Sequence, residues 1–385
     1  MRSLAYLELR KYQQAIQDCN KAISLKAKLP TPYNNRGVAH CQLDQYELAI
    51  QDLNHAIELM PSHALAHKNR AQTYRNRATA HFRLQHYHEA LQDLDHALNI
   101  HPNFAQAISD RGYMRGYLRQ YQEALQDLNH AIAIAPKLAQ AYSYRGFIYL
   151  NMKDYRLALQ DFEHALMLNP KVASYYNGRG NIYMHSQDYQ RALEDFEHAI
   201  ALAPTYASTH ATSYHNRGET YLCLNDIAQA KADFRKSLEL DPKSIVHNWM
   251  MEVCILCFES PDEEMPERLE KLASLDINPQ NSNYYLVHGC RGWAYWLRGQ
   301  FAEALAEFEQ AIVIAPYEDI IYIWVGMACA ALGRDEEAKA AFEHARKSGA
   351  PDYMFRMLKL LEQTRPDFVQ QYAAPSSLEQ ATVQN

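Results

Sequence analysis

The sequence predicts an all-α protein built from a row of similar helix pairs, and three periodic features support this prediction. Tyrosines recur at intervals of 34, 41, 34, 34 and 34 residues, at Tyr12, Tyr46, Tyr87, Tyr121, Tyr155 and Tyr189. Each tyrosine opens a stretch with small or apolar residues at i, i+3/4 and i+7, the spacing of an amphipathic helix. Prolines, which a helix interior excludes, close these stretches at Pro61, Pro102, Pro136, Pro170 and Pro204. A second helical stretch containing Arg-Gly or Arg-Ala precedes each tyrosine, so the repeating unit is two helices and two turns.

Composition limits the classes of protein to which the chain can belong. The chain has 385 residues, and 48% of them are hydrophobic, which is enough for a continuous core. The net charge of −7 disfavours general binding of nucleic acid, because phosphate contacts need clustered positive charge. The sequence has no run of about 18 apolar residues, so we expect no membrane span. The 7 scattered cysteines favour reduced thiols, and we expect a cytoplasmic location.

The copy at Ala139–Val172 shows the repeat most completely. Its marker positions are Tyr142, Arg145, Gly146, Tyr149, Ala158, Phe162 and Pro170. In spacing, this pattern resembles the tetratricopeptide repeat, with Tyr for Trp at the first marker and Arg for Leu before the glycine. The resemblance extends over nearly the whole chain. It implies a right-handed α-α superhelix of about ten helix-turn-helix repeats, and a scaffold for protein–protein interaction rather than an enzyme.

The copies are expected to follow one another in register. Residues 1–244 form an array in which the first copy is truncated and the third holds a seven-residue insertion. A degenerate copy at 245–280 and a pair of copies at 281–352 come next. The degenerate copy contains an acidic turn between Pro261 and Pro266, which we expect to loosen or divide the stack.

The two ends of the array are predicted to differ. Residues 353–372 should form a capping helix that shields the last copy from water, and the polar tail at 373–385 should be disordered. At the other end, Leu4 and Leu7 lie on a shortened first helix that no earlier copy covers. Either the chain self-associates through this uncovered repeat, or it is part of a longer repeat protein.

The Arg-Gly dipeptide predicts how the helices of one pair meet. Glycine in a helix interior is unfavourable, so its recurrence at positions such as Gly146 and Gly180 predicts a close approach of the two helices. The arginines before it precede a carboxylate by sixteen residues, in Arg36/Asp52, Arg77/Asp93, Arg111/Asp127, Arg145/Asp161, Arg179/Asp195, Arg217/Asp233 and Arg291/Glu307. Either an Arg–carboxylate pair links the two helices in each copy, or both positions are independently solvated and inherited by duplication.

No stretch carries the residue pattern of an active site. The only GxG, at 178–180, lies in a repeat helix, and the phosphate-loop, zinc-protease and serine-hydrolase motifs are missing.

Histidine recurs at one position of the second helix in six copies, at His55, His96, His130, His164, His198 and His344. Because neighbouring helix axes lie about 8–10 Å apart, these histidines cannot share a metal ion, and we interpret them as a polar outer face. We expect no enzymatic activity, no metal and no cofactor.

In proteins of the resembled family, partner segments usually lie along the first helices, which line an inner groove. The positions that would line it combine aromatic rings and amides, and they are Tyr113, Tyr117, Phe147, Asn151, Asn177, Asn181, His185 and His215. Rings offer apolar area at low entropy cost, and amides can bond a peptide backbone, so this set suits a peptide segment of another protein. The alternative is that Tyr113 and Phe147 only pack between adjacent first helices.

The insertion in the third copy predicts a local basic patch. Two similar stretches follow each other there, and 59–88 has no acidic residue but carries Lys68, Arg70, Arg75, Arg77 and Arg83. Such a patch could bind a carboxylate-rich peptide, a phosphate or RNA. The alternative function is therefore a regulator that binds RNA or another polyanion through Lys68–Arg83. A solvated accident of duplication explains the same residues without a function.

Overall fold

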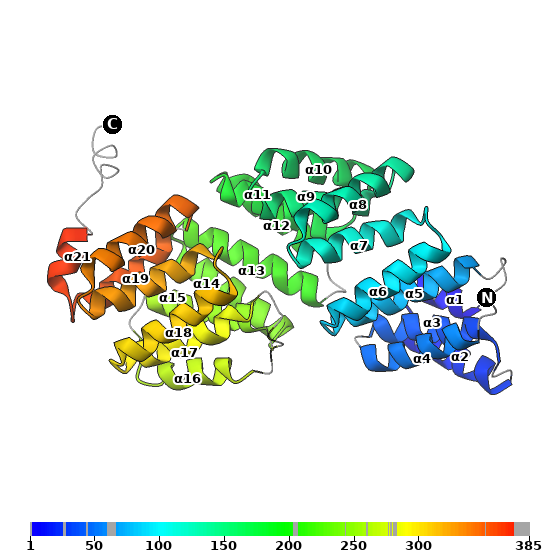
Figure 1. The fold of residues 1–385 in the computed structure, drawn as a ribbon, viewed down its shortest axis with the longest axis horizontal. Helices are drawn as coiled ribbons and strands as arrows, with labels where there is room; N and C mark the ends of the chain where they lie inside the picture. Colours follow the sequence, from blue (N-terminus) through cyan, green and yellow to red (C-terminus); the bar gives the residue numbers. More distant parts are fainter. Residues whose placement is uncertain are drawn as a thin grey trace. The chain divides into compact units, whose positions relative to one another are not determined.

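The computed structural model describes residues 2–25, 28–43, 45–59, 67–202, 207–242, 244–258, 261–275, 277, 279, 283–350 and 352–372. All regular elements within these ranges are helices (Figure 1). The chain forms two compact units, Met1–Ile182 and Tyr183–Asn385. Their boundary falls inside one helix, α11 (Ala173–His185). The tail at 373–385 lies outside the described residues.

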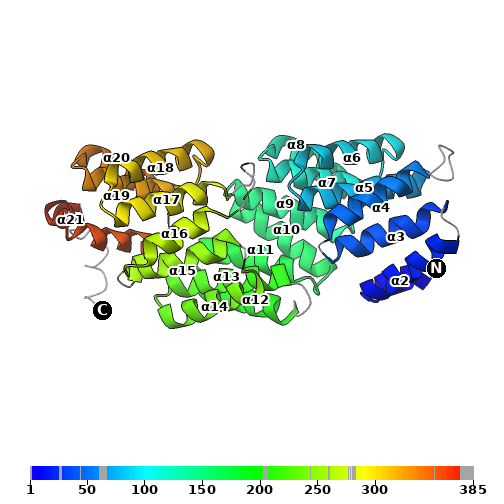
Figure 2. The same cartoon turned by 90° about the horizontal axis from the view of Figure 1, so that it is seen from below.

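The first unit consists of successive helix pairs (Figure 2). The first helices of the pairs are α1 (Arg2–Glu8), α3 (Pro30–Cys41), α5 (His67–Arg83), α7 (Ala105–Tyr117) and α9 (Ala139–Asn151). The second helices are α2 (Tyr12–Leu25), α4 (Tyr46–Glu58), α6 (Tyr87–Ile100), α8 (Tyr121–Ile134) and α10 (Tyr155–Leu168). Each of these second helices begins at the tyrosine that marked the repeat in the sequence. The insertion lengthens α5 to 17 residues, against 13 in α7.

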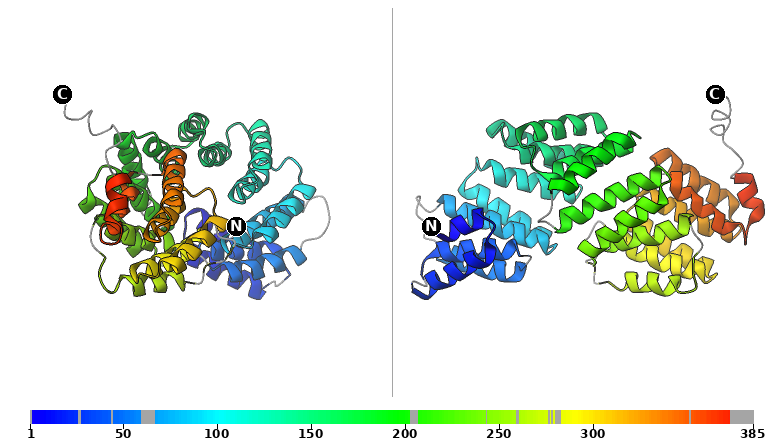
Figure 3. Two further views of the ribbon diagram at one scale, coloured as in Figure 1. Left: turned by 60° about the vertical axis from the view of Figure 1, so that its left-hand side comes forward. Right: turned by 180° about the vertical axis from the view of Figure 1, so that it is seen from behind.

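The second unit continues the pairs and adds a C-terminal segment (Figure 3). Its pairs are formed by α12 (Tyr189–Leu202), α13 (Ala207–Cys223), α14 (Ile227–Leu240), α15 (Ile245–Phe258), α16 (Met265–Ala273), α17 (Tyr285–Leu297), α18 (Phe301–Ile314), α19 (Asp319–Ala331) and α20 (Asp335–Ser348). The C-terminal segment forms a 3-10 helix, η2 (Asp352–Leu361), and a short α-helix, α21 (Pro366–Tyr372). The sequence predicts a single capping helix over 353–372, whereas the structure has two helices there.

The repeated glycine lets the two helices of a pair approach closely, as predicted. A Cβ atom at Gly146 of α9 would lie 3.1 Å from the ring of Phe162 on α10. At Gly326 of α19 the same atom would lie only 2.5 Å from the ring of Phe342 on α20. The large side chain of the second helix therefore occupies the space that a side chain at the glycine would need.

The last helix rests on the last pair through aromatic and ionic contacts. The rings of Phe368 and Tyr372 on α21 lie 6.3 and 5.0 Å from the ring of Phe342. Just before α21, Arg365 donates to the carbonyl oxygen of Ala330 at 2.7 Å and to the carboxylate of Asp335 at 2.9 Å. This arrangement anchors α21 to α19 and α20.

Candidate functional site

In four successive pairs of the first unit, the arginine of the first helix joins three helices. In α9, Arg145 donates from Nε and Nη2 to the two carboxylate oxygens of Asp161 on α10, at 2.8 and 2.7 Å. Its third nitrogen, Nη1, donates to Oδ1 of Asn129 on the preceding helix α8, at 2.6 Å. Asp161 is only 5% exposed, so the pair is well shielded from water. A bidentate guanidinium contact of this kind fixes both distance and orientation between helices.

The same pair recurs along the chain and confirms the hypothesis of Arg–carboxylate links. It is present in Arg36/Asp52, Arg77/Asp93, Arg111/Asp127 and Arg217/Asp233. Arg2 and Asp18 form one more copy, which the sequence analysis missed although the spacing is the same. The prediction for Arg291 and Glu307 was wrong, because Glu307 accepts a hydrogen bond from His288 at 2.7 Å instead.

The recurrent histidines of the second helices lie against tyrosine rings of the first helices. Ring centroids are 4.5 Å apart in Tyr33/His55, 4.2 Å in Tyr142/His164 and 3.9 Å in Tyr322/His344. The described residues contain no group of three or more metal-binding side chains. The ring contacts show that these histidines pack against the tyrosines, and the signal for this was the constant separation of 22 residues between tyrosine and histidine.

In the first unit, the candidate groove residues of α7 and α9 belong to a strip of aromatic rings. The ring of Tyr113 stacks on that of Tyr144 at 4.2 Å and lies 5.9 Å from Phe147. The ring of Tyr117 lies 5.3 Å from both Phe82 and Tyr87. Tyr113, Tyr117 and Phe147 are each half-buried, so they pack between neighbouring helices and still present part of their surface.

The candidate amides and histidines are placed less uniformly. Asn151 is exposed and donates to the carbonyl oxygen of Phe147 in its own helix, whereas Asn177 is buried. The Oδ1 atom of Asn181 is buried and accepts no hydrogen bond from the described residues. His185 and His215 belong to the second unit, where His185 is exposed and His215 lies against the ring of Phe234.

Arg83 belongs to the predicted basic patch, and its charge also acts on Tyr113 of the predicted groove. It lies at the end of α5, is exposed, and forms no ion pair within the described part of the chain. Burial raises the pKa of the Cys41 thiol to about 12, and the charge of Arg83 opposes this rise. Burial likewise raises the pKa of Tyr113, and Arg83 again acts in the opposite direction. The positive charge of Arg83 therefore acts on both Cys41 of α3 and Tyr113 of α7.

The other members of the predicted basic patch differ in whether a carboxylate of this chain binds them. Arg75 donates to the buried carboxylate of Asp110 at 2.5 Å, and Arg77 forms the interhelical pair with Asp93. The Nε atom of Arg70 is buried without a hydrogen-bond acceptor among the described residues. The side chain of Lys68 lies outside the described part. The charges of Arg75 and Arg77 are thus offset internally.

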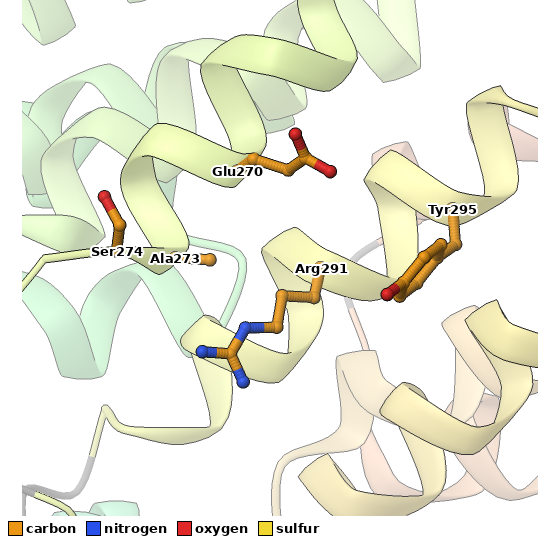
Figure 4. A pocket seen from close by; sticks show the side chains of 5 residues that line it. All are labelled: Glu270, Ala273, Ser274, Arg291 and Tyr295. Atoms are coloured by element: carbon orange, nitrogen blue, oxygen red, sulfur yellow. The ribbon is translucent and has the colours of Figure 1, made fainter.

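A hollow of about 210 Å³ in the second unit lies between α16 and α17 (Figure 4). It is lined by Glu270, Ala273, Ser274, Arg291 and Tyr295. Glu270 is already bound by Arg298, at 2.5 Å. The hollow is smaller than the 300–1,000 Å³ typical of small-molecule sites, and we do not treat it as the principal site.

Successive helix pairs, most of them with a glycine at the close approach and an arginine at the junction, define a helical-repeat protein. Models of the tetratricopeptide repeat match residues 1–29, 28–103, 139–172, 171–243, 285–317 and 320–345. The chain belongs to the tetratricopeptide repeat family, and the predicted all-α solenoid is confirmed. Members of this family bind other proteins, which makes the chain a protein-interaction scaffold in general terms. In the described part of the chain, no helix has the length and hydrophobicity needed to cross a bilayer.

Comparison with solved structures gives matches of low sequence identity. A thermophilic repeat protein of Thermus thermophilus is 21% identical, with a TM-score of 0.45 over 48% of this chain and 99% of its own. A repeat protein of Parabacteroides merdae is 18% identical, with a TM-score of 0.42 over 78% and 98%. Yeast Tom70 is 15% identical, with a TM-score of 0.48 over 100% and 91%. Comparison with curated protein sequences gives no match.

Proposed function

We propose that the chain is a non-enzymatic scaffold that binds a segment of a partner protein along the first helices of its first unit. The binding surface consists of the aromatic strip around Tyr113, Tyr117 and Phe147, together with Arg83. The partner segment carries an acidic residue next to apolar or aromatic residues. Two observations carry this proposal: Arg83 is exposed and forms no ion pair among the described residues, and its charge acts on Tyr113, one of the half-buried rings.

The chemistry of this surface favours a peptide over a small molecule. The rings are held in place by their neighbours, so a bound segment gains apolar contact without ordering them. Arg83 offers a planar donor fork that suits a carboxylate.

The test begins with a library of random 15-residue peptides selected on the full chain. We expect selected peptides to be enriched in acidic and aromatic residues. Arg83→Ala and Tyr117→Ala should each weaken their binding at least tenfold, measured by fluorescence anisotropy, because each substitution removes a direct contact.

Arg156→Ala is the matched control. Arg156 is an exposed arginine on the second helix α10, so its removal causes the same change in net charge away from the proposed surface. Its variant should bind the peptides as the wild type does. Equal affinities of wild type, Arg83→Ala and Tyr117→Ala for the selected peptides would remove this surface from consideration.

A polyanion such as RNA is the competing ligand for the basic residues. The same titration with a single-stranded RNA separates the two, because binding through phosphate contacts weakens steeply with salt. Since Asp110 and Asp93 offset Arg75 and Arg77, we expect RNA affinity to be weaker than peptide affinity at physiological salt. Tighter RNA binding that is lost in Arg83→Ala would favour the polyanion function instead.

A further inference from the structure

The second unit carries a segment of its own chain on its first helices. The 3-10 helix η2 contacts α13, α15 and α19. All three are first helices of their pairs, the class of helix on which we place the partner segment in the first unit. The C-terminal segment therefore lies on the same class of helix in the second unit.

The contact between this segment and the helices is apolar. Met357 and Leu361 are fully buried and Leu358 is 7% exposed. All three belong to the core cluster that contains Trp249 and Trp324. Between them in the sequence, Arg356 is exposed and Lys359 is partly exposed. The segment is thus amphipathic, with apolar residues at i, i+1 and i+4 directed into the unit.

The conformation of the segment depends on the surface that holds it. A 3-10 helix of ten residues is long, since 3-10 hydrogen bonds are poorly aligned and runs above three or four residues are uncommon. The segment therefore has little helix stability of its own. Its anchor is separate, because Arg365 and Phe368 hold the following residues to α19, α20 and Ala330. The segment can leave its surface while the anchor keeps it close.

We infer that residues 352–361 are an intramolecular ligand that covers a peptide-binding surface on α13, α15 and α19. A partner segment with Met or Leu at i, i+1 and i+4 would bind the same surface after displacing it. Because the segment is tethered, it competes at a high effective concentration and reduces the affinity of any such partner. This surface differs from the one proposed in the first unit, which recognises an acidic segment.

The test uses the full chain and a fluorescein-labelled peptide with the sequence of residues 350–364. A Met357→Asp/Leu361→Asp variant weakens the internal segment but retains the anchor at Arg365. We expect this variant to bind the peptide at least tenfold more tightly than the wild type, measured by fluorescence anisotropy. A peptide with the same two substitutions should not bind either protein.

The matched control is Met167→Asp/Val313→Asp, which adds the same charge at two apolar residues that are 70% and 74% exposed. It should bind the peptide no more tightly than the wild type. A folded Met357→Asp/Leu361→Asp variant that gains no affinity would overturn the inference. A wild-type dimer in light scattering that the peptide dissociates would overturn it as well, because the segment would then bind a second copy.

If the double variant loses its helical circular dichroism, hydrogen exchange in the wild type tests the same inference. Amides of residues 352–361 should exchange at least tenfold faster than those of α19, because the segment opens while the pairs stay folded. Excess peptide should accelerate this exchange further. Exchange as slow as that of α19, with or without peptide, would contradict a displaceable segment.

Discussion

The two units bury their apolar residues in different ways. In the first unit, buried residues form several small clusters, such as those around Leu53, Leu94, Leu128 and Phe162. In the second unit, one cluster extends from Leu222 to Phe368 and includes the C-terminal segment. The first unit therefore resembles a chain of neighbouring modules, and the second resembles a single globular core.

The charged pairs show the opposite distribution. Within residues 30–168, four copies of the Arg–Asp pair join α3 to α4, α5 to α6, α7 to α8 and α9 to α10. In the second unit, Arg217 retains its pair, Arg291 does not, and the last copy has Val325 and Ala341 at the two positions. The degenerate copy carries the pair in reversed order, because Arg268 of α16 donates to both carboxylate oxygens of Glu252 on α15, at 3.0 and 3.2 Å. Among the described residues, the Arg–carboxylate junction is therefore absent from the last two pairs, α17 with α18 and α19 with α20. We conclude that these two pairs depend less on single polar contacts than the pairs of the first unit.

We expect the largest difference in stability between the two units from Arg145→Ala. The substitution leaves the buried carboxylate of Asp161 without its guanidinium and removes the link to Asn129, which should destabilise the first unit by about 3 kcal/mol. Urea unfolding measures the effect with two signals. All 4 tryptophans, at 249, 293, 296 and 324, lie in the second unit, so their fluorescence reports that unit alone. Circular dichroism reports both.

We expect Arg145→Ala to lower the urea midpoint seen by circular dichroism and to leave the fluorescence midpoint unchanged. Arg291→Ala is the control, because Arg291 forms no ion pair among the described residues, and it should change neither midpoint. The double variant Arg145→Ala/Asp161→Ala should be more stable than Arg145→Ala, since no buried charge remains unpaired. Coincident shifts of both signals in Arg145→Ala would show that the units unfold together.

A smaller loss of stability is expected from a methyl group added at Gly326, where the glycine contact is tighter than at Gly146. In Gly326→Ala, the new methyl group would meet the ring of Phe342, which is completely buried and has no free space to move. This overpacking should cost about 2 kcal/mol and lower the fluorescence midpoint. In Gly146→Ala, the looser contact with Phe162 is offset by a helix-propensity gain of up to about 1 kcal/mol. Equal losses in both variants would mean that the second core is no more tightly packed than the first.

Much of the fold follows from local sequence. In each copy, the tyrosine marks the start of the second helix, the proline marks its end, and the glycine allows the two helices to approach. Because these effects are local, the spacing of the three residue types predicted the helix pairs and their close approach. The Arg–Asp pair was predictable for the same reason, since one repeat geometry brings positions sixteen residues apart together. Arg291 is the exception because His288, one turn earlier in the same helix, forms the hydrogen bond with Glu307. The repeat pattern alone does not show that a second side chain competes for this carboxylate.

Less of the candidate site could be predicted. The docking of residues 352–361 on helices far away in the sequence depends on tertiary packing, and no repeat position signals it. The basic insertion predicted five equivalent cations. In the structure, Arg75 and Arg77 form ion pairs with carboxylates on other helices. Only the structure distinguishes these from Arg83. The sequence therefore predicted where basic residues gather. Ion pairs seen in the structure show which of these residues are already bound to carboxylates.

The smallest expected effect concerns the anchor of the C-terminal segment and depends on pH. Hydrogen bonds from Arg365 lower the pKa of Asp335 and of Asp367 below the ordinary value of 3.8. Because the folded state holds these carboxyls ionised, the anchor is complete above about pH 4 and is lost as the pH falls through the lowered pKa values. Arg365→Met should accelerate amide exchange in α21 relative to the wild type at pH 6, and this difference should shrink at pH 3. A difference of the same size at both pH values would show that the carbonyl of Ala330 and the ring of Phe368, and not the carboxylates, hold the anchor.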